Sequence, residues 1–166
     1  NKAASNPVSG NFAIFATGND GKEVAGYPAA HYKYIGVSAF GPDYLPTSYT
    51  NYGPGTNISA PGGDYAINST SSTPQRAQIL STLPEELGNG DYGYMQGTSM
   101  ACPHVSGVAA LGLSYAAQLR KHYKASEFKE LLINTGRDLN QYYTGIKKYN
   151  YFHSSPGSPT TQMELA

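Results

Sequence analysis

Short apolar runs separated by turn-forming residues fill the first sixty positions of the chain. Residues 11–16, 34–39 and 56–59 have the length and composition of strands, and clusters of Gly, Asn and Pro lie between them. Further on, the apolar pattern changes to helical spacing. It predicts one helix from near Thr98 to about Lys121 and another from about Ser126 to Thr135, with Ser126 as the N-cap.

The first predicted helix presents a narrow stripe of small side chains, which suits tight packing on a sheet. The stripe is formed by Ala101, Val105, Val108 and Gly112. Gly97 stands just before the helix and permits backbone angles that other residues avoid. Ser99 then falls in the first turn, where free backbone N–H groups and the helix dipole favour a developing anion. This arrangement is suited to presenting a nucleophile.

Composition narrows the class of protein. The 166 residues suffice for one domain, and 11 basic side chains balance 11 acidic ones. The sequence has no stripe of basic residues of the kind that binds nucleic acid, and it has no apolar stretch long enough to span a membrane. The single cysteine, Cys102, cannot form an internal disulfide. We interpret Cys102 as a small buried residue rather than a second nucleophile.

The segment Gly97-Thr98-Ser99-Met100-Ala101-Cys102-Pro103-His104-Val105-Ser106-Gly107 resembles the serine motif of the subtilisin-like serine peptidases. Every fixed position of that motif is met, and Cys102 and Ser106 occupy its two variable places. The resemblance implies that Ser99 is the catalytic nucleophile. An α/β-hydrolase esterase is disfavoured, because its Gly-x-Ser-x-Gly elbow would need glycine at position 101.

A second block lies upstream. The apolar run that ends at Ala16 leads into the turn formers Thr17-Gly18-Asn19-Asp20-Gly21, which resemble the Ala-Ala-Gly-Asn block of the same family. A strand followed by such a turn delivers an amide side chain to the carboxyl edge of a sheet, where α/β proteins bind ligands. The resemblance implies that Asn19 donates to the oxyanion, with the Ser99 N–H as second donor.

Further similar blocks occur in family order, and the resemblance covers roughly residues 10–140. It implies an α/β fold, the C-terminal portion of a three-layer subtilisin-like domain with a mainly parallel sheet flanked by helices. It also pairs Ile79–Thr82 with Tyr92–Gln96 as a hairpin and leaves 66–78 as a surface insertion. We therefore expect residues 1–140 to form the C-terminal part of a peptidase domain, and 141–166 to be a polar tail or its closing segment.

The family resemblance also implies a substrate pocket. One wall is expected from Ala16, Thr17 and Gly18, and the floor from Gly26, Tyr27 and Pro28. Threonine replaces the usual alanine at position 17, and we expect it to narrow this pocket. The sequence predicts neither a metal site nor a cofactor in these residues.

The aspartate and histidine motifs of the family would both precede Asn11, and they are absent from this sequence. No aspartate is placed to orient His31, His104 resembles a structural family histidine, and His122 and His153 fall in remote segments. Because serine needs a base to remove its proton, we expect the chain alone to be inactive. We expect open sheet and helix surfaces to pair with a missing N-terminal part of the domain or with a second copy.

The sequence thus predicts a fragment of a serine endopeptidase that hydrolyses polypeptide substrates through an acyl-enzyme on Ser99. The family resemblance implies a secreted, periplasmic or cell-surface location. An alternative interpretation is a non-catalytic subtilisin-like binding or scaffold module. The retention of Ser99 and Asn19 favours the peptidase, because a scaffold has no physical need for either.

Overall fold

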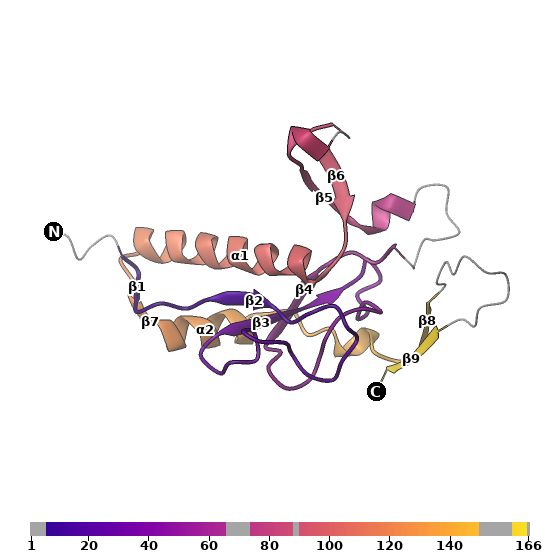
Figure 1. Ribbon diagram of the computed structural model, residues 1–166. Coiled ribbons are helices and arrows are strands. Elements are labelled where there is room, and N and C mark those ends of the chain that lie inside the picture. The colour runs from indigo at the N-terminus through magenta and orange to yellow at the C-terminus, as the bar shows by residue number, and fades with distance from the viewer. Residues whose placement is uncertain (1–5, 66–73, 88–89, 150–160, 166) are drawn as a thin grey trace.

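The computed structural model describes residues 6–65, 74–87, 90–149 and 161–165 of the chain (Figure 1). In chain order the elements are β1 (Val8–Ser9), β2 (Ile14–Ala16), β3 (Ile35–Phe40), β4 (Ile58–Pro61), η3 (Pro74–Ala77), β5 (Ile79–Thr82), η4 (Glu85–Leu87), β6 (Tyr92–Met95), α1 (Thr98–Gln118), β7 (Tyr123–Lys124), α2 (Ala125–Asn134), η5 (Asn140–Tyr142), β8 (Gly145–Tyr149) and β9 (Thr161–Leu165).

A parallel sheet in the order β2-β3-β4 lies at the centre, with α1 on one side and α2 on the other (Figure 1). The middle strand β3 is almost entirely buried, as its run of apolar and small residues requires. Its side chains Ile35, Val37 and Ala39 join Ala60 of β4 and residues of both helices in one core. The predicted α/β class is therefore confirmed, as are the three predicted strands to within a few residues.

The buried stripe of α1 consists of Ala101, Val105, Ala109 and Ala116. The prediction was wrong at Val108, which is 57% exposed, because the helix turns Ala109 toward the sheet instead. Gly112 is also exposed rather than buried, although a Cβ built there would stand 3.2 Å from Cζ of Phe128 in α2. Small side chains on this stripe let the helix approach the sheet closely.

Helix α1 and its C-cap also carry large apolar side chains that are exposed in the described part of the chain. They are Val108, Leu111, Tyr115 and Leu119, with exposed fractions from 47% to 73%. Strand β2 likewise pairs with β3 alone, so one of its edges is open within the described part of the chain. Apolar faces and sheet edges of this kind are the surfaces through which protein segments associate.

Two further pairs of strands lie at the periphery of the domain. Strands β5 and β6 form the predicted antiparallel hairpin, which projects from the start of α1 (Figure 1). The entry segment forms β1, which pairs with β7 in parallel. Helix α2 begins one residue before the expected N-cap Ser126, because the Glu127 carboxylate accepts the Lys124 N–H at 2.8 Å. Of the expected surface insertion 66–78, residues 66–73 lie outside the described residues.

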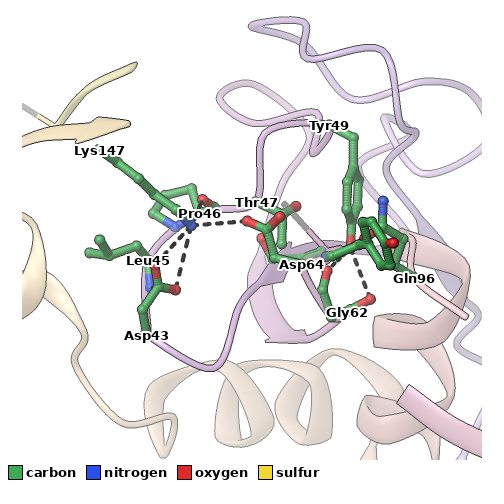
Figure 2. Close-up of polar contacts among 12 residues, drawn as sticks. Asp43, Leu45, Pro46, Thr47, Tyr49, Gly62, Asp64, Gln96 and Lys147 are labelled. Atoms are coloured by element: carbon green, nitrogen blue, oxygen red, sulfur yellow. Dashed lines mark hydrogen bonds and ion pairs between the residues drawn. The ribbon is translucent and has the colours of Figure 1, made fainter. Parts of the chain in front are cut away.

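Strand β8 contacts the body of the domain through Lys147, whose side chain is only 4% exposed (Figure 2). The ammonium forms ion pairs with Asp43 at 3.0 Å and with Asp64 at 3.1 Å, and it donates to the Pro46 carbonyl at 2.8 Å. The Asp64 side chain is 1% exposed. A charge this deeply buried requires a partner of opposite sign, so Lys147 and Asp64 hold each other in place.

We expect Lys147→Met to lower the free energy of unfolding by about 3–5 kcal/mol, because it leaves the buried Asp64 carboxylate without this ammonium. Adding Asp64→Asn removes the buried negative charge and recovers most of the loss. Urea unfolding of the two variants measures both effects. Equal stability of Lys147→Met and the original chain would contradict the assignment.

Candidate active site

Ser99 lies in the first turn of α1 and is exposed. The helix begins after Gly97, whose φ of 146° and ψ of 162° suit glycine rather than a residue with a Cβ. Gly97 is buried and its N–H donates to the Gly62 carbonyl at 2.9 Å. The glycine thus anchors the helix start to the corner after β4, and Ser99 projects from that anchored end.

Asn19 reaches the same helix end from the loop that follows β2. Its Oδ1 accepts the Thr98 N–H at 2.8 Å and the Thr98 hydroxyl at 2.8 Å. A backbone N–H can only donate, so the carboxamide atom facing it must be the oxygen. The amide therefore has one orientation, in which Nδ2 points away from Thr98.

Thr98 holds this contact from the interior of the protein. Its side chain is 0% exposed, and its hydroxyl accepts the Gly18 N–H at 3.3 Å while it donates to Asn19. The hydroxyl thus contacts the backbone before Asn19 and the side chain of Asn19 itself. Sequence reasoning overlooked Thr98, although it lies inside the serine motif.

Two hydrogen-bond donors remain available beside Ser99. Met100 and Ala101 both donate their N–H groups to the Gly97 carbonyl, and Thr98 donates to Asn19. Within the described residues, no acceptor meets the Ser99 N–H or Asn19 Nδ2. An exposed hydroxyl next to two unoccupied donors at a helix N-terminus is an arrangement that can stabilise an oxyanion.

The corner that receives Gly97 is itself held firmly (Figure 2). The Tyr49 hydroxyl donates to the carbonyls of Gly62 and Gly63 at 2.9 and 2.5 Å. Burial, together with the Asp64 charge, raises the pKa of Tyr49 to about 12, so the hydroxyl stays protonated at neutral pH. Gln96 adds a contact by accepting the Tyr65 N–H at 2.6 Å.

The two segments expected to line a substrate pocket lie together, because the Gly26 N–H donates to the Thr17 carbonyl at 2.7 Å. Gly26, Tyr27 and Pro28 are exposed, whereas Ala16 and Gly18 are half-buried. The expectation that the Thr17 side chain narrows the pocket is wrong. Thr17 is 0% exposed, and its hydroxyl donates inward to the carbonyls of Val37 and Asn51.

No histidine in the described part of the chain has a contact with Ser99. His104 Nδ1 lies 2.8 Å from the Met100 carbonyl, His122 Nδ1 lies 3.1 Å from the Asn6 carbonyl, and His31 stacks on Tyr32. His153 lies outside the described residues. The site therefore holds a hydroxyl and donors, and the residues described here add no imidazole base to it.

The described residues around Ser99 offer little for thiol or metal chemistry. Burial raises the pKa of the Cys102 thiol, which donates to the Ile14 carbonyl at 3.5 Å, so it is a poor nucleophile. No group of three or more His, Cys, Asp or Glu residues in the described ranges could hold a metal ion. Nor does any described helix have the length and apolar character needed to cross a membrane.

A hollow beside the sheet is a separate feature. A cavity of about 750 Å³ lies between β4, α1 and the segment after α2. Its lining includes His104, Leu132 and Tyr143, but neither Ser99 nor Asn19. The cavity is therefore distinct from the arrangement around the nucleophile.

Known proteins resemble this chain in sequence and in fold. The model of the Subtilase family, Peptidase_S8, matches residues 2–152. Halolysin of Haloferax mediterranei is 38% identical over 115 residues, which are 67% of this chain and 19% of halolysin. The extracellular protease of Xanthomonas campestris pv. campestris is 35% identical over 133 residues, 78% of this chain and 20% of that protein.

Solved structures show a similar fold. A protease from Pseudoalteromonas arctica PAMC 21717 superimposes with a TM-score of 0.61 at 32% identity, covering 78% of this chain and 37% of that one. The fold and the serine motif thus define a subtilisin-like α/β domain. The chain belongs to the subtilase family. It spans about a fifth of the length of these two relatives.

We expect Gly97→Ala to destabilise the chain by about 1–3 kcal/mol, because its φ is strained for any residue with a Cβ. A Cβ there would also stand 3.4 Å from Asn19 Nδ2. The matched control is Gly107→Ala in the middle of α1, where a Cβ meets nothing within 4 Å. That change is expected to stabilise the chain by up to about 1 kcal/mol. Urea unfolding compares them, and effects of the same sign would count against this description of the helix start.

Proposed function

We propose that this chain carries the nucleophile and the oxyanion hole of a serine endopeptidase. The observation that supports the proposal is the fixed carboxamide of Asn19. Because Thr98 occupies its oxygen, Nδ2 is left as a donor beside Gly97, next to the Ser99 N–H. Two such preorganised donors are suited to the charge that develops on a carbonyl oxygen during acyl transfer.

In the proposed reaction, Ser99 Oγ attacks the carbonyl carbon of a peptide bond and its proton passes to a base. The carbonyl oxygen becomes an oxyanion between Asn19 Nδ2 and the Ser99 N–H. When the tetrahedral intermediate collapses, the C–N bond breaks and the amine leaves with a proton from the same base. Water then hydrolyses the Ser99 ester and regenerates the hydroxyl.

The aspartate and histidine of this mechanism come, on our proposal, from polypeptide outside residues 1–166. That polypeptide is either another segment of the same protein or a separate chain. The exposed apolar side chains of α1, among them Leu111 and Tyr115, and the open edge of β2 support such a partner. Covering them would bury apolar surface and pair the strand edge at the same time.

The substrate is proposed to be a polypeptide that lies along the loops after β2 and before β3. Gly26, Tyr27 and Pro28 are exposed, and Tyr27 is 84% exposed, so they are accessible to a side chain of the substrate. Ala16 and Gly18 complete the wall. Relatives named extracellular proteases support a location outside the cytoplasm.

A subtilisin-like scaffold without catalysis remains the alternative. The isolated chain is expected to release no product from a peptide ester above the level of its Ser99→Ala variant, because the described residues bring no base to Ser99. A steady-state ester assay on the two purified chains makes the comparison. Turnover that depends on Ser99 would show that this chain supplies its own base.

In the protein joined to its aspartate and histidine, we expect Asn19→Ala to lower kcat by roughly 100- to 1,000-fold with little change in KM. That magnitude was measured for this donor in subtilisin and is carried over to this chain. The physical reason is that the donor acts on the transition state more than on bound substrate. Peptide hydrolysis kinetics test it, and an unchanged kcat would favour the scaffold.

A further inference from the structure

Asn51 is a buried asparagine in the connection between β3 and β4, and its side chain reaches the loop that carries Asn19. It is 2% exposed. Its Oδ1 accepts the Asp20 N–H at 2.9 Å and the Lys22 N–H at 3.2 Å. Its Nδ2 donates to the Thr17 carbonyl at 3.1 Å and lies 3.5 Å from Asp20 Oδ2.

These contacts use the full capacity of the carboxamide, which has two acceptor positions and two N–H donors. The backbone of Asn51 also forms hydrogen bonds with this loop. Its N–H donates to the Gly18 carbonyl at 2.9 Å, and its carbonyl accepts the Thr17 hydroxyl at 3.0 Å. The loop is therefore held immediately before and immediately after Asn19 by a single residue.

A glycine in the loop makes room for this asparagine. Gly18 has a φ of 111°, and a Cβ built on it would stand 2.6 Å from Asn51 Nδ2. No side chain fits there unless Asn51 moves. The close approach of the loop backbone to Asn51 therefore depends on glycine at position 18.

We propose that Asn51 is a positioning residue for the oxyanion hole, an inference that rests on the proposed peptidase function. Thr98 fixes the tip of the Asn19 side chain, and Asn51 fixes the backbone from which that side chain extends. Both ends are needed, because a donor displaced by about 1 Å can cost roughly 100-fold in rate. Asn51 touches neither substrate nor nucleophile and acts through Asn19 alone.

Asn57 provides a matched control. It is half-buried in the same β3–β4 connection, and its Oδ1 accepts the Gly36 N–H at 2.9 Å. It therefore supports β3 by the same kind of side chain to backbone contact, but within the described residues no hydrogen bond joins it to the loop that carries Asn19. A general loss of stability is expected from Asn57→Ala, and a specific loss of loop order from Asn51→Ala.

The first experiment uses this chain and needs no catalysis. Amide hydrogen exchange of the Thr98 N–H reports its bond to Asn19 Oδ1. We expect Asn51→Ala to speed this exchange roughly tenfold more than Asn57→Ala does, the change that corresponds to one hydrogen bond of ordinary strength. Should Asn51→Ala fail to fold, Asn51→Ser replaces it, since the hydroxyl keeps part of the polarity. Equal exchange in a folded Asn51 variant and the control would overturn the proposal.

The second experiment uses the protein joined to its aspartate and histidine. Asn51→Ala is expected to lower kcat roughly 10- to 100-fold with KM nearly unchanged, and to have almost no further effect when Asn19 is already alanine. A purely structural role would lower activity equally in both backgrounds, and this result would reject the proposal. If Asn19→Ala itself leaves kcat intact, the peptidase function fails, and the exchange measurement still decides whether Asn51 orders the loop.

Discussion

The site depends on one contact, the acceptance of the Thr98 N–H and hydroxyl by Oδ1 of Asn19. The contact joins the loop after β2 to the N-terminus of α1 and caps a helix whose own N-cap, Gly97, has no side chain. It also decides the chemistry, because a carboxamide that accepts with its oxygen must present its nitrogen elsewhere. One pair of hydrogen bonds therefore completes the helix end and leaves a donor oriented beside Ser99.

The rest of the domain keeps the two partners of this contact in register. Strand β3 and the small side chains of α1 set the distance between helix and sheet, and a larger residue at Ala101 or Ala109 would push them apart. The Gly62 corner receives Gly97, while Tyr49 holds that corner. On the other side of the contact, the Asn51 side chain holds the loop that carries Asn19 by hydrogen bonds to its backbone. The core thus keeps the C-terminal end of strand β2 beside the N-terminal end of helix α1.

The main strands and helices, and the two motifs that carry Ser99 and Asn19, could be predicted from the sequence because each is encoded in a short segment. Ser99 and Asn19 belong to contiguous motifs, and β3, the β5–β6 hairpin and both helices follow from short-range pattern. The features that the sequence did not predict depend on contacts between residues far apart in the chain. In α1, Ala109 rather than Val108 continues the buried stripe, and the Thr17 side chain is buried because its hydroxyl donates to two backbone carbonyls. Lys147 in a polar segment appears solvated until the fold brings it to Asp64, 83 residues away in sequence.

The most direct test of the account is a structure of this chain combined with the polypeptide proposed to supply the aspartate and histidine, with a peptide phosphonate bonded to Ser99. The phosphonyl oxygen imitates the oxyanion of the transition state. We predict that it lies about 2.7–3.1 Å from both Asn19 Nδ2 and the Ser99 nitrogen, with Asn19 Oδ1 still bound to Thr98. An oxygen that faces solvent, or an Asn19 carboxamide turned over or withdrawn from the adduct, would contradict the account.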